Sequence, residues 1–314
     1  MSPSKPKLKT TRAAKPKIVV VLGPTASGKS DLAVKVAIHF NGEVISADSR
    51  QVYKGLNIGS GKITPEEMMG IPHHLLDVVS PAKIFTASDY SELAKKEIKN
   101  IIGHGKLPVI CGGTGFYINA LLYGNSFAPV PPDPKIRKQL KKISTEELAK
   151  KLAEIDPERF ASIDIKNRVR LIRALEIVMT TGQPIAKINP TTEYDTLKVG
   201  ILWDKEDLDR RIELRLDHRL NDGMIEEVGR LKFPEKGRGL SWKRLNDLGL
   251  EYRFISLYLK GDLSYDDMRA KLLTAIKQYA KRQMTWFKRD KKIIWLKPDE
   301  LEKARELTEK FIKE

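Results

Sequence analysis

The chain has 314 residues, of which 41% are hydrophobic, and a formal net charge of +16 from 57 Lys and Arg against 41 Asp and Glu. One cysteine excludes an internal disulfide bond and a multi-cysteine zinc site, and no apolar run reaches the roughly 20 residues that span a bilayer. We therefore expect a cytoplasmic protein that does not enter a membrane. The basic excess favours a polyanionic partner, usually nucleic acid.

The N-terminal segment, residues 1–16, contains five basic residues, three prolines and no acidic residue. This composition cannot bury a core and is typical of a disordered tail. It fits a plain solvated tail better than one that helps to hold nucleic acid.

Residues 17–130 alternate between strand and helix patterns. Buried or short strands are predicted at 17–22, 42–49 and 106–115, and helices at 30–40 and from about Ser88 onward. This alternation predicts an α/β fold with a parallel sheet and helices on both faces, of the P-loop NTPase-like kind.

A phosphate-binding loop follows the first strand directly. Its eight residues, "GPTASGKS", match the pattern G-x-x-x-x-G-K-[ST] without a mismatch. They are Gly23, Pro24, Thr25, Ala26, Ser27, Gly28, Lys29 and Ser30. Backbone N–H groups from Thr25 to Ser30 are expected to wrap a phosphate, Lys29 to reach its outer oxygens, and the Ser30 hydroxyl to ligate Mg²⁺. The loop alone leaves open whose phosphate it binds.

The acidic residue that an NTPase places after its third strand is missing, because that strand ends in "VICGGTG". Asp48, in "VISADSRQVY", follows the second strand instead. It can hold a metal, act on a second substrate or cap the next segment. Since ligands of parallel sheets bind at the carboxyl ends of the strands, Ser27–Ser30, Asp48 and Thr114 are expected on one rim.

The middle of the chain reads as a helical insertion. Four prolines lie in the segment from Pro129 to Pro134. The following pattern to about Gly182 is helical without strand candidates. Ser144 and Glu147 form a possible capping box. We assign 131–192 to a helical domain, and 17–130 with 193–314 to the α/β core domain, in which a strand begins at Leu197.

The segment 268–292 has nine basic residues and one acidic residue, interleaved with Tyr279, Trp286 and Phe287. For the charges we favour contact with a polyanion, and for the aromatic side chains packing in the core rather than stacking on bases. Cys111, in an apolar run, is interpreted as core rather than as a reactive thiol. The pair His73 and His74 is interpreted as structural rather than as a metal site.

Several motifs together resemble the tRNA dimethylallyltransferase (tRNA isopentenyltransferase) family. They are "GPTASGKS", "ISADSRQVYKGLNIGSGK", "GIPHHLLDVVSP", "CGGTGFYINALLYG", "RVRLIRALEIVMTTGQP" and "QYAKRQMTWFKRD", in this order between about residues 17 and 292. The resemblance implies an enzyme that uses its loop on dimethylallyl diphosphate rather than ATP. Such enzymes prenylate N6 of the adenosine 3′ to the anticodon, at position 37 of tRNA, and release diphosphate.

The resemblance also implies roles for single residues. Asp48 takes the role of the base, and Lys29 with Mg²⁺ stabilises the leaving diphosphate. Thr114 and Arg137 match positions near the tRNA and the reacting groups. Further tRNA contacts are implied for Asp48, Ser49, Arg50, Gln51, Val169, Arg170, Leu171, Ile172 and Arg173. The expected partners are thus the anticodon arm of tRNA and dimethylallyl diphosphate, bound by a monomer.

The chain departs from the family where Glu251 precedes Tyr252, in place of a Gly-Tyr element. Three other functions stay open on the residues alone. A phosphate-loop kinase would turn over ATP in a way that depends on Lys29. A prenyltransferase for free adenine nucleotides would not need the basic helical insertion. A basic RNA-binding module with a relict loop would bind RNA without turnover.

Overall fold

The computed structural model describes residues 15–124, 130–185 and 191–314. The chain divides into two compact units, Met1–Leu122 with Thr192–Glu314, and Tyr123–Thr191. The larger unit contains the phosphate loop, and the smaller unit contains most of the segment predicted as a helical insertion. The predicted tail lies, up to residue 14, outside the described residues.

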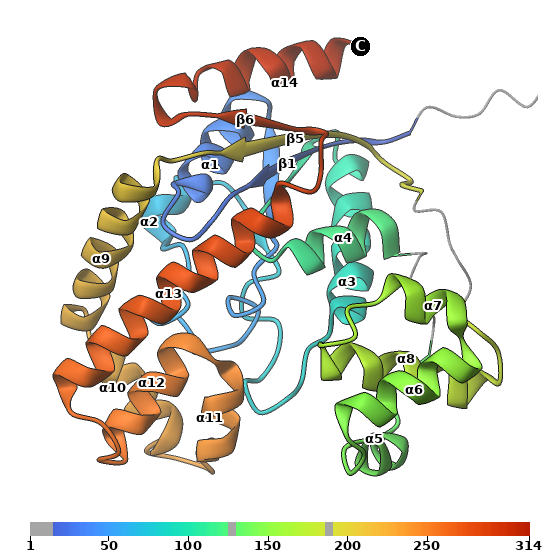
Figure 1. Ribbon diagram of the computed structural model, residues 1–314. Helices are drawn as coiled ribbons and strands as arrows, with labels where there is room; N and C mark the ends of the chain where they lie inside the picture. Colours follow the sequence, from blue (N-terminus) through green and yellow to red (C-terminus); the bar gives the residue numbers. More distant parts are fainter. Residues whose placement is uncertain (1–14, 125–129, 186–190) are drawn as a thin grey trace, which may run out of the picture. The chain divides into compact units, whose positions relative to one another are not determined.

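Six parallel strands form one sheet in the larger unit, in the order β3-β2-β4-β1-β5-β6. Figure 1 labels β1, β5 and β6 of this sheet. They are β1 (Lys17–Leu22), β2 (Gly42–Ser46), β3 (His73–His74), β4 (Leu107–Gly112), β5 (Asp195–Ile201) and β6 (Ile293–Leu296). The predicted parallel sheet is confirmed. The sequence pattern does not predict β3 and β6, because runs of two and four residues are too short to show a period.

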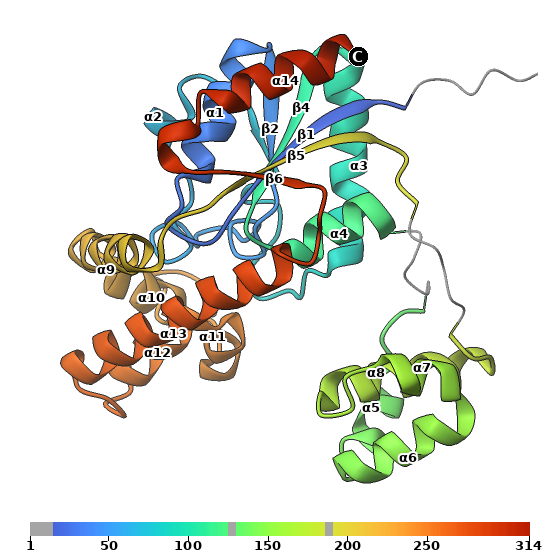
Figure 2. The same ribbon diagram turned by 45° about the horizontal axis from the view of Figure 1, so that its top comes forward.

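Helices cover both faces of this sheet, as predicted (Figure 2). On one face α1 (Lys29–His39) and α14 (Lys303–Lys313) pack on a core that includes Val19 and Val21 of β1. Side chains alternate along a strand, so Val20 points to the other face, which α3 (Ala87–Gly103) covers. All three valines are completely buried. This two-sided burial explains why the central strands read as unbroken apolar runs.

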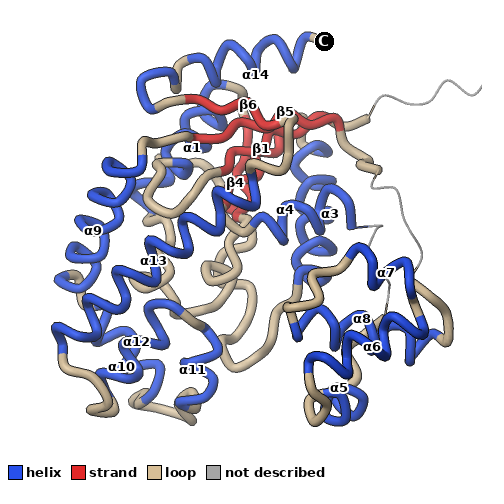
Figure 3. Tube along the Cα trace, viewed as in Figure 1, coloured by secondary structure: helices blue, strands red, loops and turns tan. Residues whose placement is uncertain are grey.

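A second helical layer of the larger unit lies beyond the carboxyl ends of the strands (Figure 3). It contains α9 (Lys205–Asn221), α10 (Met224–Lys232), α11 (Trp242–Leu248), α12 (Leu250–Leu259) and α13 (Tyr265–Phe287). Two short helices, α2 (Pro65–Met68) and α4 (Gly115–Tyr123), follow β2 and β4 along the chain. Within the described ranges no helix, α13 included, is long and apolar enough to cross a membrane.

The described part of the smaller unit consists of helices and the loops that join them, without a strand. Its helices are α5 (Pro134–Leu140), α6 (Thr145–Ile155), α7 (Pro157–Ser162) and α8 (Arg168–Thr181). Leu148 and Leu152 of α6 pack against Leu171 and Leu175 of α8 in a core of its own. The predicted capping box at Ser144 is confirmed and begins α6.

Candidate active site

The phosphate loop joins the central strand β1 to α1. Gly28, the residue before α1, has a φ of 87°, a left-handed conformation that glycine adopts without steric cost. Among the described residues, the N–H groups of Ala26, Gly28, Lys29 and Ser30 make no hydrogen bond. They therefore remain able to bind an anion at the positive end of the helix.

Two of the predicted phosphate donors are already used within the protein. The N–H of Thr25 donates to Oε1 of Gln283 at 2.9 Å, and the N–H of Ser27 donates to the Pro24 carbonyl at 3.3 Å. The Lys29 ammonium also donates to the Pro24 carbonyl, at 3.2 Å. Burial lowers the pKa of Lys29, and the nearby Arg215 lowers it further. An incoming phosphate would give this ammonium a better partner than a carbonyl oxygen.

Asp48 lies in a tight turn directly after β2. Its Oδ1 accepts the N–H groups of Arg50 at 2.8 Å and Gln51 at 3.3 Å. Its Oδ2 accepts no hydrogen bond from the part of the chain that the structure describes. The carboxylate is therefore fixed in orientation by one oxygen and keeps the other one available for a ligand.

Thr114 reaches the same turn from the neighbouring strand β4. Its Oγ1 accepts the N–H of Ser49 at 3.1 Å, and its own N–H donates to the Ala47 carbonyl at 3.1 Å. Its hydroxyl also hydrogen-bonds Tyr279 of α13. Burial raises the pKa of Tyr279 to about 12, with the charge of Asp48 as the next cause. The structure thus brings Asp48 and Thr114 together, as the sequence predicts.

Arg50 and Gln51 both have partners in the protein. The Arg50 guanidinium donates to the Leu248 carbonyl at the end of α11. The Gln51 amide accepts from Ser46 Oγ at 3.0 Å and donates to the Gly61 carbonyl at 3.1 Å. Both residues line the cavity described below, and their contact with tRNA stays a prediction.

Three arginines of α9, which the sequence pattern does not predict as site residues, face the phosphate loop and the loop around Gly59. Arg211 donates to the Ala26 carbonyl at 2.8 Å, Arg215 to Thr25 Oγ1 at 3.2 Å, and Arg219 to the Gly59 carbonyl at 3.5 Å. Their spacing of four residues places them on one side of the helix. This spacing is visible in the sequence, but it indicates a site only once the buried face of α9 is known.

These elements surround a cavity of about 760 Å³. Its walls include the loop residues Thr25 to Ser30, the turn Asp48 to Gln51, the three α9 arginines, and Tyr279, Arg282 and Gln283 of α13. Burial lowers the pKa of Arg215 to about 10, and the like charge of Arg219 adds to this. Crowding of buried cations in one cavity is typical of a site for a multiply charged anion.

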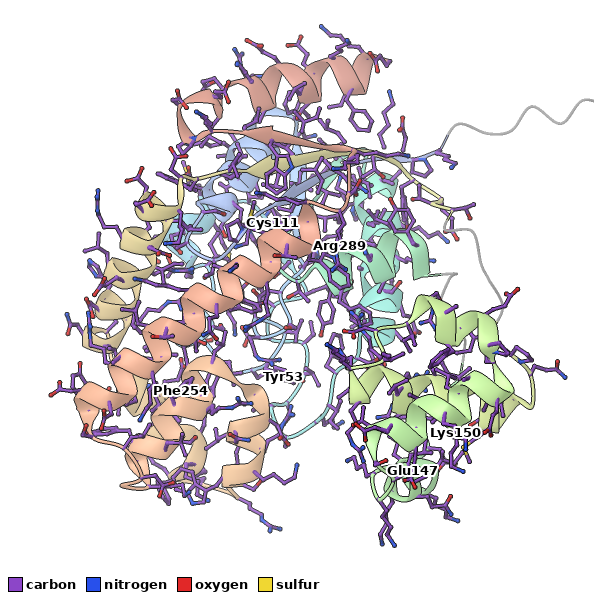
Figure 4. All side chains as sticks on the ribbon, viewed as in Figure 1. Tyr53, Cys111, Glu147, Lys150, Phe254 and Arg289 are labelled. Atoms are coloured by element: carbon purple, nitrogen blue, oxygen red, sulfur yellow. The ribbon has the colours of Figure 1, made fainter. Side chains whose placement is uncertain are left out.

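Two other buried side chains, the Glu251 carboxyl and the Cys111 thiol, also line the cavity. Burial raises the pKa of Glu251, which lies 3.4 Å from the Arg219 guanidinium. Burial likewise raises the pKa of Cys111 to about 11. Cys111, labelled in Figure 4, belongs to the core against α1, so its interpretation as core is confirmed.

The aromatic residues of α13 differ in burial: Phe287 is buried, and Tyr279 and Trp286 are half-buried. Phe287 is buried, as expected, whereas Tyr279 lines the cavity. Trp286 stands edge-on to Phe116, with ring centroids 6.5 Å apart. Packing in the core is therefore wrong for Tyr279 and right for Phe287.

The histidine pair has protein partners. His73 contacts the Ile71 carbonyl at 2.8 Å, and His74 contacts Glu43 at 2.6 Å and Glu97 at 3.4 Å. Burial lowers the pKa of His73. These contacts agree with the structural role predicted for both side chains, although His73 also lines the cavity.

In the smaller unit, Arg137 and Arg173 share one buried carboxylate. Glu176 accepts from Arg137 at 2.8 Å, from Arg173 at 2.6 Å and from the Asp133 N–H at 2.6 Å. Burial alone would raise the pKa of Glu176, but these hydrogen bonds bring it below its ordinary value. Both arginines therefore present a fixed, partly exposed guanidinium.

The segment predicted to meet tRNA, Val169–Arg173, lies at the start of α8. Leu171 and Ile172 are 0% and 8% exposed and belong to the core of the smaller unit. Val169 is 77% exposed, and Arg170 is exposed as well. The side chains of Leu171 and Ile172 therefore support the helix, and those of Val169 and Arg170 are accessible to a partner.

The oxygen atoms of the cavity fit Mg²⁺ that arrives with a diphosphate. Within the described residues, Ser27 Oγ is buried without a hydrogen-bond partner, the Ser30 hydroxyl interacts with the Cys111 thiol, and Asp48 Oδ2 accepts no hydrogen bond. Among the described residues no cluster of three or more His, Cys, Asp or Glu can hold a metal. Mg²⁺ typically combines one or two protein oxygens with substrate phosphates, so this donor set suits it.

Comparison with known proteins identifies the family. A family model described as IPP transferase matches residues 51–290. The tRNA dimethylallyltransferase 1 of Citrifermentans bemidjiense is 42% identical over 285 residues, which cover 89% of this chain and 92% of that protein.

Solved structures agree with this match. The tRNA isopentenylpyrophosphate transferase from Bacillus halodurans is similar with a TM-score of 0.71 at 33% identity, over 95% of this chain and 97% of that one. A eukaryotic dimethylallyltransferase acting on tRNA is similar with a TM-score of 0.81 at 25% identity, over 95% and 80%. The family resemblance is confirmed: the chain belongs to the IPP transferase family.

Proposed function

We propose that the protein transfers a dimethylallyl group from dimethylallyl diphosphate to N6 of the adenosine 3′ to the anticodon, at position 37 of tRNA, and releases diphosphate. The observation that carries this proposal is one cavity that joins the phosphate loop, the α9 arginines and the Asp48 carboxylate. The family relationship supports the reaction class.

The diphosphate would lie against the loop N–H groups, Lys29 and the α9 arginines. In the reaction the bond from C1 of the donor to the diphosphate oxygen breaks, and the electron pair leaves with the diphosphate. Donors held ready for this growing negative charge lower the barrier, and a single one is typically worth about 10²–10³ in rate. Arg215 and Lys29 are held in place by Thr25 and Pro24, so they need little reorganisation.

Asp48 would accept the proton of the adenine amine while N6 forms its bond to C1 of the donor. A positioned general base contributes roughly 10²–10⁴ in rate. Two N–H groups occupy Oδ1, so Oδ2 is the oxygen that would take the proton in the cavity that Asp48 lines. Ser30 and Ser27 are the residues that would hold Mg²⁺, which when bound supplies positive charge to the leaving diphosphate.

The tRNA would be recognised through its anticodon arm. The exposed Lys135, Lys138, Lys142 and Arg170 of the smaller unit offer basic side chains for its phosphates. The target base must leave the stack of the anticodon loop to reach the cavity beside Asp48. Cavity-lining Arg282 and Tyr279 of α13 are suited to contact a base that has done so.

The experiment incubates the protein with Mg²⁺, labelled dimethylallyl diphosphate and unmodified tRNA whose anticodon is followed by adenosine. Nuclease digestion and mass spectrometry then locate the label. We expect it on that one adenosine, without any need for ATP. Label on free AMP would indicate the nucleotide prenyltransferase instead, and Lys29-dependent ATP consumption without transfer would indicate the kinase.

A further inference from the structure

One side chain of α13, Gln283, connects two loops of the active site. Its Oε1 accepts the N–H of Thr25 at 2.9 Å, and its Nε2 donates to the Gly113 carbonyl at 2.9 Å. The first bond spans 258 positions of the chain and the second 170. The amide therefore uses one acceptor and one donor on two separate backbone segments.

These segments serve different parts of the proposed reaction. Thr25 belongs to the phosphate loop, and its hydroxyl also receives Arg215. Gly113 precedes Thr114, whose hydroxyl accepts the N–H of Ser49 next to Asp48. Gln283 thus stands between the groups that bind the leaving diphosphate and the turn that carries the base.

The bridge is tightly enclosed. Gln283 is 7% exposed, so loss of its hydrogen bonds would leave the buried Gly113 carbonyl without this partner and would free the part-buried N–H of Thr25. A Cβ atom on Gly113 would lie 2.3 Å from Nε2 of Gln283, while its next contact, the Gly23 carbonyl oxygen, lies at 3.4 Å. A side chain at position 113 would therefore push the Gln283 amide out of this position.

We propose that Gln283 is a positioning residue, which sets the distance between the phosphate loop and the Thr114–Asp48 turn and so between donor carbon and attacking amine. The inference rests on the proposed function. Transfer requires its two reacting atoms in near contact, and a misplacement of about 1 Å can cost about 10²-fold in rate. A fixed bridge between the two loops meets this requirement.

The first test compares Gln283→Met, which keeps the length of the side chain and removes both hydrogen bonds, with Gln278→Met on the exposed side of α13. At saturating donor and tRNA, we expect the single-turnover transfer rate of Gln283→Met to fall by about 10–100-fold. The tRNA dissociation constant and the circular dichroism spectrum should stay unchanged, and Gln278→Met should behave as the wild type. A wild-type rate for Gln283→Met, or tRNA binding that weakens in step with the rate, would overturn the inference.

The second test keeps Gln283 in the chain and displaces its amide group with a side chain at position 113, so it also serves if Gln283→Met folds poorly. Gly113→Ala should slow transfer in the wild-type background and have little further effect in a Gln283→Ala background, because the clash is then gone. Equal effects in both backgrounds would contradict the role of Gln283. If the wild type itself transfers no label, the proposed function fails instead, whatever these variants do.

Discussion

Glu227 and Tyr252 meet in the interior of the larger unit, where the Tyr252 hydroxyl donates to Glu227 Oε1 at 3.1 Å. The same carboxylate accepts the N–H groups of Asn57, Ile58 and Gly59 at 2.8, 2.7 and 3.0 Å. It is 4% exposed. One buried carboxylate thus shapes the loop whose Gly59 carbonyl receives Arg219.

We expect Glu227→Gln to impair donor use as well as folding. The new amide NH₂ would face backbone N–H donors and could not accept their hydrogen bonds. The loss of such a buried hydrogen bond costs about 1–3 kcal/mol of stability. Because the loop also supports Arg215 and Arg219, the KM for dimethylallyl diphosphate should rise. Denaturant unfolding and steady-state kinetics measure both effects. The exposed neighbour Glu226, changed to Gln, is the matched control, and equal behaviour of the two variants would contradict this account.

Arg215 should contribute to kcat through the planar pair of N–H donors of its guanidinium group, and not only through its charge. A single donor at a leaving group is typically worth about 10²–10³ in rate, so Arg215→Met should lower kcat by about that factor. Arg215→Lys keeps a charge but loses the planar pair of donors, and should recover only part of it. Arg210, exposed on the same helix, gives the control variant Arg210→Met. Unchanged inhibition by pyrophosphate in Arg215→Met would show that the diphosphate does not lie there.

The sequence predicts the central elements of this site because they are local. The phosphate loop and Asp48 each follow a buried strand, and parallel strands bring their carboxyl ends to one edge. The α9 arginines, Glu227 and Gln283 are not predicted. Their roles depend on contacts over 150 or more positions, such as the 168 that separate Glu227 from Gly59. Leu171 and Ile172 illustrate a different limit of prediction from sequence. The motif implies contact with tRNA for both residues, but it does not reveal that their side chains point into the core of the smaller unit.

In the smaller unit, Glu176→Gln should loosen the attachment of Arg137 and Arg173. We expect a loss of stability near the low end of about 1–3 kcal/mol, because both guanidinium groups are about a third exposed to water. Hydrogen exchange in α5 and α8 measures it, and the exposed Glu154, changed to Gln, is the control. Protection that is equal in Glu176→Gln and in the control would contradict a structural role of Glu176.

The same carboxylate predicts an acid transition. The pKa of Glu176 in the folded protein lies below its ordinary value of 4.5, so the folded state favours the charged form. Its contribution to stability is therefore complete above pH 4.5 and is lost as the pH falls through the folded pKa. In Glu176→Gln, the hydrogen exchange of α5 and α8 should change less over this range than in the wild type.

The central claim is that Asp48 accepts the amine proton in a cavity that holds the donor by its diphosphate. The most direct test is the single-turnover rate of label transfer to tRNA by Asp48→Asn, measured beside its tRNA dissociation constant. Asn keeps an oxygen for the N–H groups of Arg50 and Gln51 but cannot take the proton. We expect the rate to fall by roughly 10²–10⁴ with tRNA binding unchanged. A rate equal to that of the wild type, or a loss of tRNA binding that accounts for the whole decrease, would contradict this role of Asp48.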